Sequence, residues 1–204
     1  PVCYSTRLTT VGDGTERAEV EARRLFPQAT VTRVDRDALH RADAARQTWE
    51  GIRSGAWDIL IGTQAVFQRG PLPRRGLVGI MQADSGLHIP DFRAAERTYQ
   101  LLDEAVAVAR PESEGGRVIV QTRFPAHHAV QAMLSADPQR FYDEELAARR
   151  LLNYPPACVL AALSVSGKDR QEVETAALRW RLCLEQLVGT EAPPSMLGPV
   201  PAMG

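Results

Sequence analysis

The chain has 204 residues, 44% of them hydrophobic, and its 24 Lys and Arg against 25 Asp and Glu leave a formal net charge of -1. This size allows a folded core without disulfides, and the near-neutral charge excludes a bulk attraction to nucleic acid or anionic lipid. Three widely spaced cysteines argue against a secreted disulfide framework, and no apolar run approaches the roughly 20 residues of a membrane span. We expect a cytoplasmic piece of a longer protein.

Apolar periodicity predicts alternating helices and strands along residues 15–122. A capping box of Asp13 and Glu16 opens the first helix, and Asp91 is the expected N-cap of the long one. The expected helices are 15–26, 42–55 and 92–109, and the expected strands are 29–35, 57–62, 77–81 and 117–122. This alternation predicts an α/β fold with an open parallel sheet covered on both faces. Ligands of such sheets bind at the carboxyl ends of the strands, here Asp35 and residues 62–64, 82–84 and 121–122.

Beyond the sheet, helices are expected at 127–135 and 138–151, followed by an extended NYPP segment at 153–156. A strand at 158–167 and a helix at 170–189 then begin a second, incomplete α/β domain. Cys158 and Cys183 lie on the apolar faces of these two elements, which predicts that both are core residues.

Five segments carry a family resemblance: VCYST at 2–6, GTER at 14–17, DILIGTQ at 58–64, ADSGLHIPDFRAAERTYQLL at 83–102 and ELAARRLLNYPP at 145–156. Together they resemble the PriA family of primosomal replication-restart helicases. The resemblance implies that residues 1–11 end a zinc-binding insertion, 12–152 form a second RecA-like helicase lobe, and 153–204 start the C-terminal domain. It also implies a monomer that binds forked or single-stranded DNA, single-stranded DNA-binding protein and primosomal loading proteins. Cys3 would be one zinc ligand, with the other ligands outside this chain.

The chain departs from the family pattern at its ATPase motifs. Gln68 and Leu72 replace a Lys and a Phe, and the strand expected to end in Asp-x-Asp ends in QAD at 82–84. The family motif Gln-x-x-Gly-Arg-x-Gly-Arg aligns without gaps to EAVAVARP at 104–111, which places Val108 and Pro111 at the arginine positions. Arginines of this kind stabilise the transferred phosphoryl group by a factor on the order of 10³ to 10⁵. We therefore expect little or no ATP hydrolysis, and ATP itself is a doubtful ligand.

The candidate DNA contacts are Thr63, Gln64, Arg69, Arg74, Arg75 and Arg93. For the arginines at 69, 74 and 75, a DNA contact and a solvated loop without DNA contact are weighed equally. For Arg93 and Arg97, pairing with Asp91 or Glu96 is favoured over a DNA contact. A metal or catalytic cluster of Asp84, Ser85, His88 and Asp91 is weighed against a polar loop with a helix cap, and the loop is favoured. His127 and His128 are expected to be solvated.

Three functions are compatible with these patterns. The favoured one is a replication-restart and primosome-assembly factor that binds DNA without ATPase or helicase activity. The alternatives are a working ATP-dependent 3′–5′ DNA helicase and a protein-interaction scaffold without DNA contact.

Overall fold

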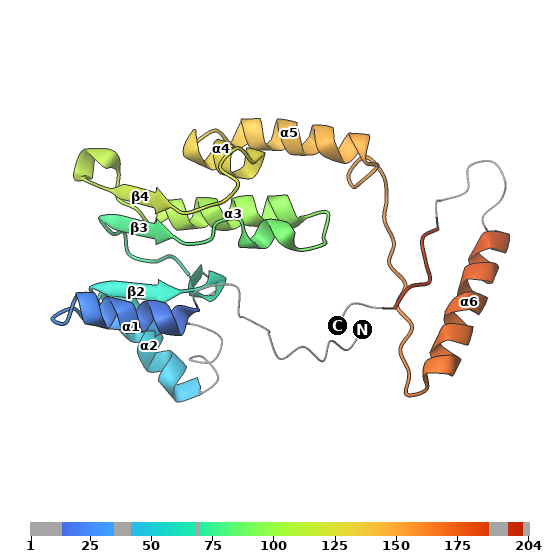
Figure 1. Ribbon diagram of the computed structural model, residues 1–204, viewed down its shortest axis with the longest axis horizontal. Helices are drawn as coiled ribbons and strands as arrows, with labels where there is room; N and C mark the ends of the chain where they lie inside the picture. The colour runs from blue at the N-terminus through green and yellow to red at the C-terminus, as the bar shows by residue number, and fades with distance from the viewer. Residues whose placement is uncertain (1–13, 35–41, 68–69, 188–195, 202–204) are drawn as a thin grey trace. The chain divides into compact units, whose positions relative to one another are not determined.

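A computed structural model of the chain describes residues 14–34, 42–67, 70–187 and 196–201. Five residues that the sequence analysis singles out lie outside the described residues: Cys3, Asp13, Asp35, Gln68 and Arg69. Cys3 is the predicted zinc ligand, and Asp13 is half of the predicted capping box. The chain divides into two compact units, Pro1–Leu152 and Asn153–Gly204 (Figure 1).

The first part of unit 1 is a pair of parallel strands with two helices. Its elements are α1 (Thr15–Leu25), β1 (Val31–Val34), α2 (Ala42–Ser54), β2 (Ile59–Gly62) and the short 3₁₀ helix η2 (Gln64–Phe67). Val31 pairs with Ile59, and the register continues to Val34 and Gly62. The buried cluster of this part consists of Val34, Trp49, Ile52, Trp57 and Val66. Apolar residues of β1, α2 and η2, with Trp57 before β2, thus fix this half of the fold.

Gly62 ends β2 at a point of close backbone approach. A Cβ atom built there would lie 2.3 Å from Val66 Cγ1 and 2.7 Å from the carbonyl oxygen of Val34. No side chain fits in this space, so a glycine is required where β2 passes to Thr63.

The second part of unit 1 pairs β3 with β4 and packs three helices together. Its elements are β3 (Leu77–Ile80), η3 (Ser85–His88), α3 (Ala94–Ala107), η4 (Glu112–Glu114), β4 (Arg117–Val120), α4 (His128–Leu134) and α5 (Pro138–Leu151). The strands are parallel, with Leu77 opposite Arg117 and Ile80 opposite Val120. The Tyr99 and Phe141 rings stack at 4.2 Å in the centre of the helical core, and Phe141 is fully buried.

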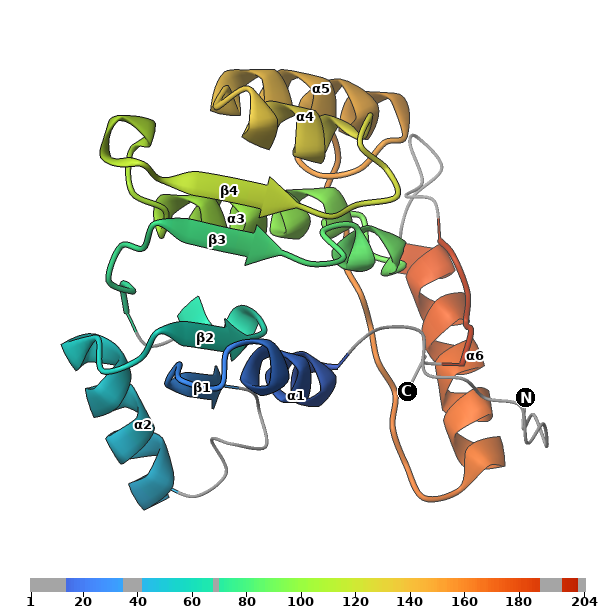
Figure 2. The same cartoon turned by 60° about the vertical axis from the view of Figure 1, so that its left-hand side comes forward.

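The structure is α/β with parallel strands, as expected, but two details of the expected sheet are wrong. The strands form two separate two-stranded sheets, β1-β2 and β3-β4, rather than one open sheet. The β3–β4 sheet is also covered on one face only, since Leu77 and Ile119 are about 60% exposed. Their neighbours Ile80 and Val120 pack against the helical core, and Figures 1 and 2 show α3 running along one side of these strands. One-sided helix packing produces the alternation of exposure.

Unit 2 contains α6 (Arg170–Leu187) and extended chain. The strand expected at 158–167 is absent, because a strand needs a neighbour for its backbone groups and the described part of the chain offers none there. The expectation that Cys158 and Cys183 are core residues is also wrong: Cys183 is exposed, Cys158 is partly exposed, and no residue of α6 is buried. Among the described residues, no helix is both long enough and apolar enough to cross a membrane.

Candidate nucleic-acid interface

Thr63 and Gln64 follow β2 at its carboxyl end, where the sequence predicts a DNA contact. Both are exposed, and Gln64 opens η2. The amide of Val66 donates to the carbonyl oxygen of Thr63 at 3.0 Å, so the backbone is held while the side chains face solvent. Polar groups in this arrangement can contact phosphate oxygens.

Asp84 joins the carboxyl ends of β3 and β4. Its carboxylate, only 6% exposed, accepts a hydrogen bond from the Arg123 amide at 3.0 Å, and the Ala83 amide donates to the carbonyl oxygen of Gln121 at 2.9 Å. The bond from the Arg123 backbone, with further help from the Thr122 side chain, lowers the pKa of Asp84 despite its burial. A buried carboxylate thus holds the two loops after the strands in one position.

The other members of the expected polar loop do not form a catalytic or metal cluster around Asp84. His88 Nε2 lies 3.7 Å from Asp84 Oδ2, and among the described residues no three His, Cys, Asp or Glu side chains gather where they could hold a metal. The zinc ligand that the resemblance implies, Cys3, lies outside the described residues, so zinc binding stays a prediction.

The sequence predicts that Asp91 is the N-cap of a helix starting at Phe92, and this prediction is wrong. The helix α3 begins at Ala94 after Arg93, and Asp91 instead accepts a hydrogen bond from the Arg93 amide at 2.8 Å. This local turn occupies residues that the apolar periodicity assigned to the helix.

Arg93 and Arg97 both pair with nearby carboxylates. Arg93 Nε lies 3.2 Å from Glu96, and Arg97 lies 2.8 Å from Asp91. The hydrogen bond from Arg93 is the main reason that the pKa of Glu96 is lowered. These are the pairs that the sequence favours for the two arginines, and a DNA contact of Arg93 stays a prediction.

Arg74 and Arg75 lie at the opposite end of the strands from Thr63. The Arg75 guanidinium stacks 4.0 Å over the Trp57 ring and its NH2 group donates to the carbonyl oxygen of Gly55, both of which precede β2. This position follows from the topology. The chain leaves β2 at its carboxyl end and must return to the amino end before β3 can run parallel to β2, and Arg74 and Arg75 lie at the end of that return. The predicted contacts are therefore not one patch, and Arg75 is half-buried in a structural contact while Arg74 is exposed.

The same end of the β3–β4 sheet holds the segment that aligns with the family arginine motif. The Arg75 amide donates to the carbonyl oxygen of Val108 at 2.9 Å, and the Arg110 amide donates to that of Arg75 at 2.8 Å. Val108 caps the end of α3, and Pro111 has extended backbone, with φ -53° and ψ 149°. Neither side chain carries a charge, unlike the arginines of the family motif, and the ATP prediction stays untested by the described residues.

A charged network that the sequence analysis missed links α3, α4 and α5. His128 Nε2 lies 2.8 Å from the buried Glu145, whose other oxygen accepts from Arg149 at 2.9 Å. Arg149 also pairs with Glu96 at 2.9 Å, which extends the network to Arg93. The spacing of Glu145 and Arg149 on one helix was the available sequence signal.

The expectation that His127 and His128 are solvated is wrong. The side chain of His128 is 20% exposed and pairs with Glu145, while His127 Nδ1 accepts from the Ala129 amide at 3.2 Å and caps α4. Desolvation lowers the pKa of His127, with a smaller contribution from His128. Both rings belong to the support of α4 and α5.

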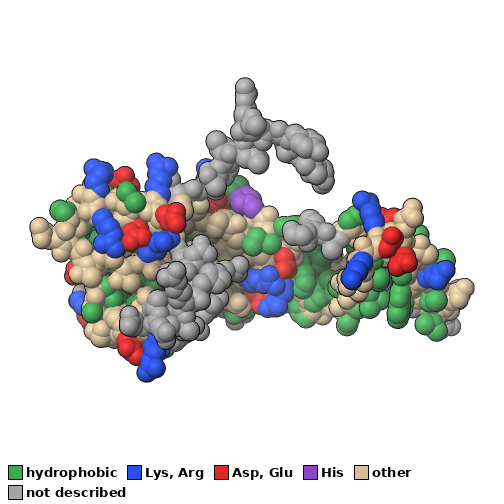
Figure 3. All heavy atoms as spheres, turned by 90° about the horizontal axis from the view of Figure 1, so that it is seen from below, with side chains coloured by type: hydrophobic (Ala, Val, Ile, Leu, Met, Phe, Trp, Pro, Cys, Tyr) green, Lys and Arg blue, Asp and Glu red, His purple; other side chains and the backbone are tan. Residues whose placement is uncertain are grey.

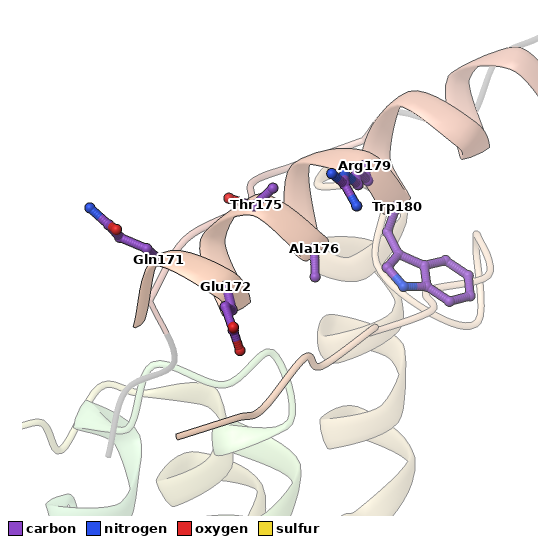
Figure 4. A pocket seen from close by; sticks show the side chains of 6 residues that line it. All are labelled: Gln171, Glu172, Thr175, Ala176, Arg179 and Trp180. Carbon is purple, nitrogen blue, oxygen red and sulfur yellow. The ribbon is translucent and has the colours of Figure 1, made fainter. Parts of the chain in front are cut away.

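Other surfaces of the described chain carry less chemistry. On the face drawn in Figure 3, arginine and lysine side chains lie among aspartates and glutamates rather than in one basic stretch. A shallow depression along α6 is lined by Gln171, Glu172, Thr175, Ala176, Arg179 and Trp180 (Figure 4). Its lining contains one acidic and one basic side chain, Glu172 and Arg179.

No family model matches the chain, but curated bacterial proteins do. Replication restart protein PriA of Bacillus subtilis is 39% identical over 178 residues, which are 87% of this chain and 22% of that protein. The same protein of Treponema pallidum is 42% identical over 87% of this chain and 27% of its own length, and that of Synechocystis is 35% identical over 99% and 24%. The chain thus spans about a quarter of the length of these relatives. Along the segment that it shares with them, it belongs to the replication restart protein PriA family.

Proposed function

We propose that this chain is the second helicase-like lobe of a replication-restart factor that binds forked or single-stranded DNA and does not hydrolyse ATP. The similarity to replication restart protein PriA over 87% to 99% of the chain is the observation that supports the restart role. Partners would include single-stranded DNA-binding protein and primosomal loading proteins, in the cytoplasm where the chromosome is copied. Zinc would bind upstream, with Cys3 as one ligand.

The DNA-binding part of the proposal is supported by the carboxyl ends of the strands. Thr63 and Gln64 are exposed on a fixed backbone, and Asp84 holds the loops after β3 and β4 together. Both strand pairs are parallel, and parallel α/β folds bind ligands at the carboxyl ends of their strands. Arg74 and Arg93 are exposed or partly exposed and would contribute phosphate contacts of lower specificity.

The absence of ATP hydrolysis is supported by Val108 and Pro111. The backbone of this segment is bonded to Arg75 on both sides of Ala109, so Arg110 cannot shift by one residue into the position of a missing arginine without breaking those bonds. Restoring register would cost at least two backbone hydrogen bonds, each contributing about 0.5–1.5 kcal/mol.

The test is an ATPase assay on the intact protein with and without forked DNA, because no phosphate-binding loop GxxxxGK[ST] lies within these 204 residues. We expect no fork-stimulated hydrolysis, and hydrolysis that forked DNA stimulates would contradict the proposal. The variant R110A is the control for such a signal, since hydrolysis that depends on Arg110 would vanish in it and contamination would not.

Binding to forked DNA at two salt concentrations tests the DNA contact separately. We expect binding that weakens with salt, because phosphate contacts release counterions. A protein that assembles with primosomal partners but leaves forked DNA unbound at both salt concentrations would instead be an interaction scaffold.

A further inference from the structure

Two exposed rings lie together at the carboxyl end of the β3–β4 sheet. The centroids of His88 and Phe124 are 5.4 Å apart, with their planes at 66°. The His88 side chain is 61% exposed and Phe124 is 47% exposed. Phenylalanine is usually buried, and here a half-exposed phenylalanine ring lies in an edge contact with a second exposed ring.

The backbone on both sides of this ring pair is fixed. The Phe124 amide donates to Thr122 Oγ1 at 3.0 Å, and the preceding Arg123 amide donates to the buried Asp84 carboxylate. His88 ends η3, which packs so closely on α3 that a Cβ atom at Gly86 would lie 2.5 Å from Thr98 Oγ1. Rings that are already in place lose little conformational entropy when a ligand binds.

The charge around the rings suits a nucleic acid. Arg123 is exposed immediately before Phe124, whereas the neighbouring Asp84 carboxylate is buried and accepts a hydrogen bond from the Arg123 amide. Aromatic faces stack on unpaired bases, and a guanidinium contacts phosphate. A duplex offers no free base face except at its ends, so the chemistry favours a single strand.

We propose that His88 and Phe124 form a base-stacking platform for single-stranded DNA, with Arg123 beside it on the sugar-phosphate backbone. This proposal rests on the DNA-binding function proposed above and adds the type of contact and the strand state. It places one unpaired base against Phe124, with the edge of His88 limiting its position.

The experiment compares Phe124→Leu, Phe124→Tyr and the matched control Phe26→Leu in the intact protein. Phe26 is a second exposed phenylalanine, 55% exposed after α1 and outside the ring pair. Affinity is measured by fluorescence anisotropy for a strand of about 15 nucleotides and for an abasic strand of equal length. Thermal melting of each variant checks that the fold is unchanged.

We expect F124L to weaken binding to the normal strand by about 5- to 150-fold, the range of one lost base stack. F124Y and F26L keep the wild-type affinity, and F124L binds the abasic strand as tightly as the wild type does. The salt dependence stays the same in F124L because no charge is removed.

Each other outcome has a distinct meaning. Wild-type binding that F124L leaves unchanged would overturn the platform and leave the DNA-binding proposal standing. An equal loss on the normal and abasic strands would also overturn it, since no base is then involved. A wild-type protein that binds neither single strands nor forks would overturn both proposals.

Discussion

The loops at the two ends of the β3–β4 sheet are held in place by different interactions. At the carboxyl end, the buried Asp84 carboxylate bonds to the Arg123 amide, and polar and aromatic side chains around it face solvent. At the amino end, backbone bonds tie Arg75 to Val108 and Arg110, and the Arg75 side chain covers Trp57.

This difference shows that the two ends of one sheet can be held by different interactions, a buried carboxylate at one end and backbone hydrogen bonds at the other. The amino end retains a regular hydrogen-bonded bridge although the positions aligned with family arginines hold Val108 and Pro111. The carboxyl end retains exposed groups of the kind that bind ligands. The two edges can therefore be altered independently, which substitutions of Asp84 and Arg75 test.

The largest effect is expected at Asp84, where Asp84→Ala leaves the Arg123 amide without its acceptor. A hydrogen bond to a charged group contributes about 1.5–3 kcal/mol, so we expect a loss of this size in urea unfolding at neutral pH. Because the pKa of Asp84 is lowered in the folded state, its stabilisation is present above about pH 4 and is lost as pH falls through the folded pKa. The difference between D84A and wild type should shrink accordingly in acid.

Asp84→Asn and Asp103→Ala complete this experiment. Asn keeps an acceptor without the charge and should lose less than D84A, and Asp103 is an exposed carboxylate on α3 whose removal should change stability by less than about 0.5 kcal/mol. If D84A unfolds like D103A, the carboxyl end does not depend on the buried carboxylate.

At the amino end, Arg75→Met keeps the length of the side chain and removes its charge from the Trp57 ring. A cation–π contact contributes about 0.5–2 kcal/mol according to its burial, so we expect a loss near 1 kcal/mol. Tryptophan fluorescence during urea unfolding measures it in a Trp180→Phe background, which removes the exposed tryptophan of unit 2. The neighbouring Arg74→Met should have no effect, and equal losses in both variants would show that the Trp57 contact is not the cause.

The smallest effect is a change in pH dependence at His127. Desolvation lowers its pKa, so below about pH 6.5 the unfolded chain binds a proton that the folded chain resists, and stability falls as the pH decreases. His127→Asn should flatten this fall, because Asn caps α4 without titrating there. Urea midpoints measured from pH 7 downward give the slope.

His127→Ala separates capping from titration. It should lose about 1 kcal/mol at neutral pH through the missing cap and should also have the flatter slope. A slope in H127N as steep as that of the wild type would show that another group controls the acid response.

Local patterns predicted α3 and α5 because each of these helices buries apolar residues of its own. The helix expected at 138–151 is α5 at the same residues, and Phe141 within it is fully buried. The strand expected at 158–167 depended on a partner strand that apolar composition cannot supply.

The candidate site was harder to predict because it depends on how the chain connects one strand to the next. Thr63 and Arg74 are near each other in sequence, but a parallel strand must start at the amino end, and this rule alone would have separated them. His128 and Glu145 are 17 residues apart on two helices, and their contact follows from packing that no local spacing reveals. The ring pair of His88 and Phe124 likewise comes from two separate loops.

Gly62 gives the region around Thr63 and Gln64 a particular freedom to vary. Because only a glycine fits between Val34 and Val66, the direction in which the chain leaves β2 is set before either exposed residue is reached. Random substitution of positions 63 and 64, with Gly62 kept, would therefore change the exposed side chains while the backbone keeps its direction. Under the DNA-binding function proposed above, a selection for altered DNA preference would begin with a library randomised at these two positions.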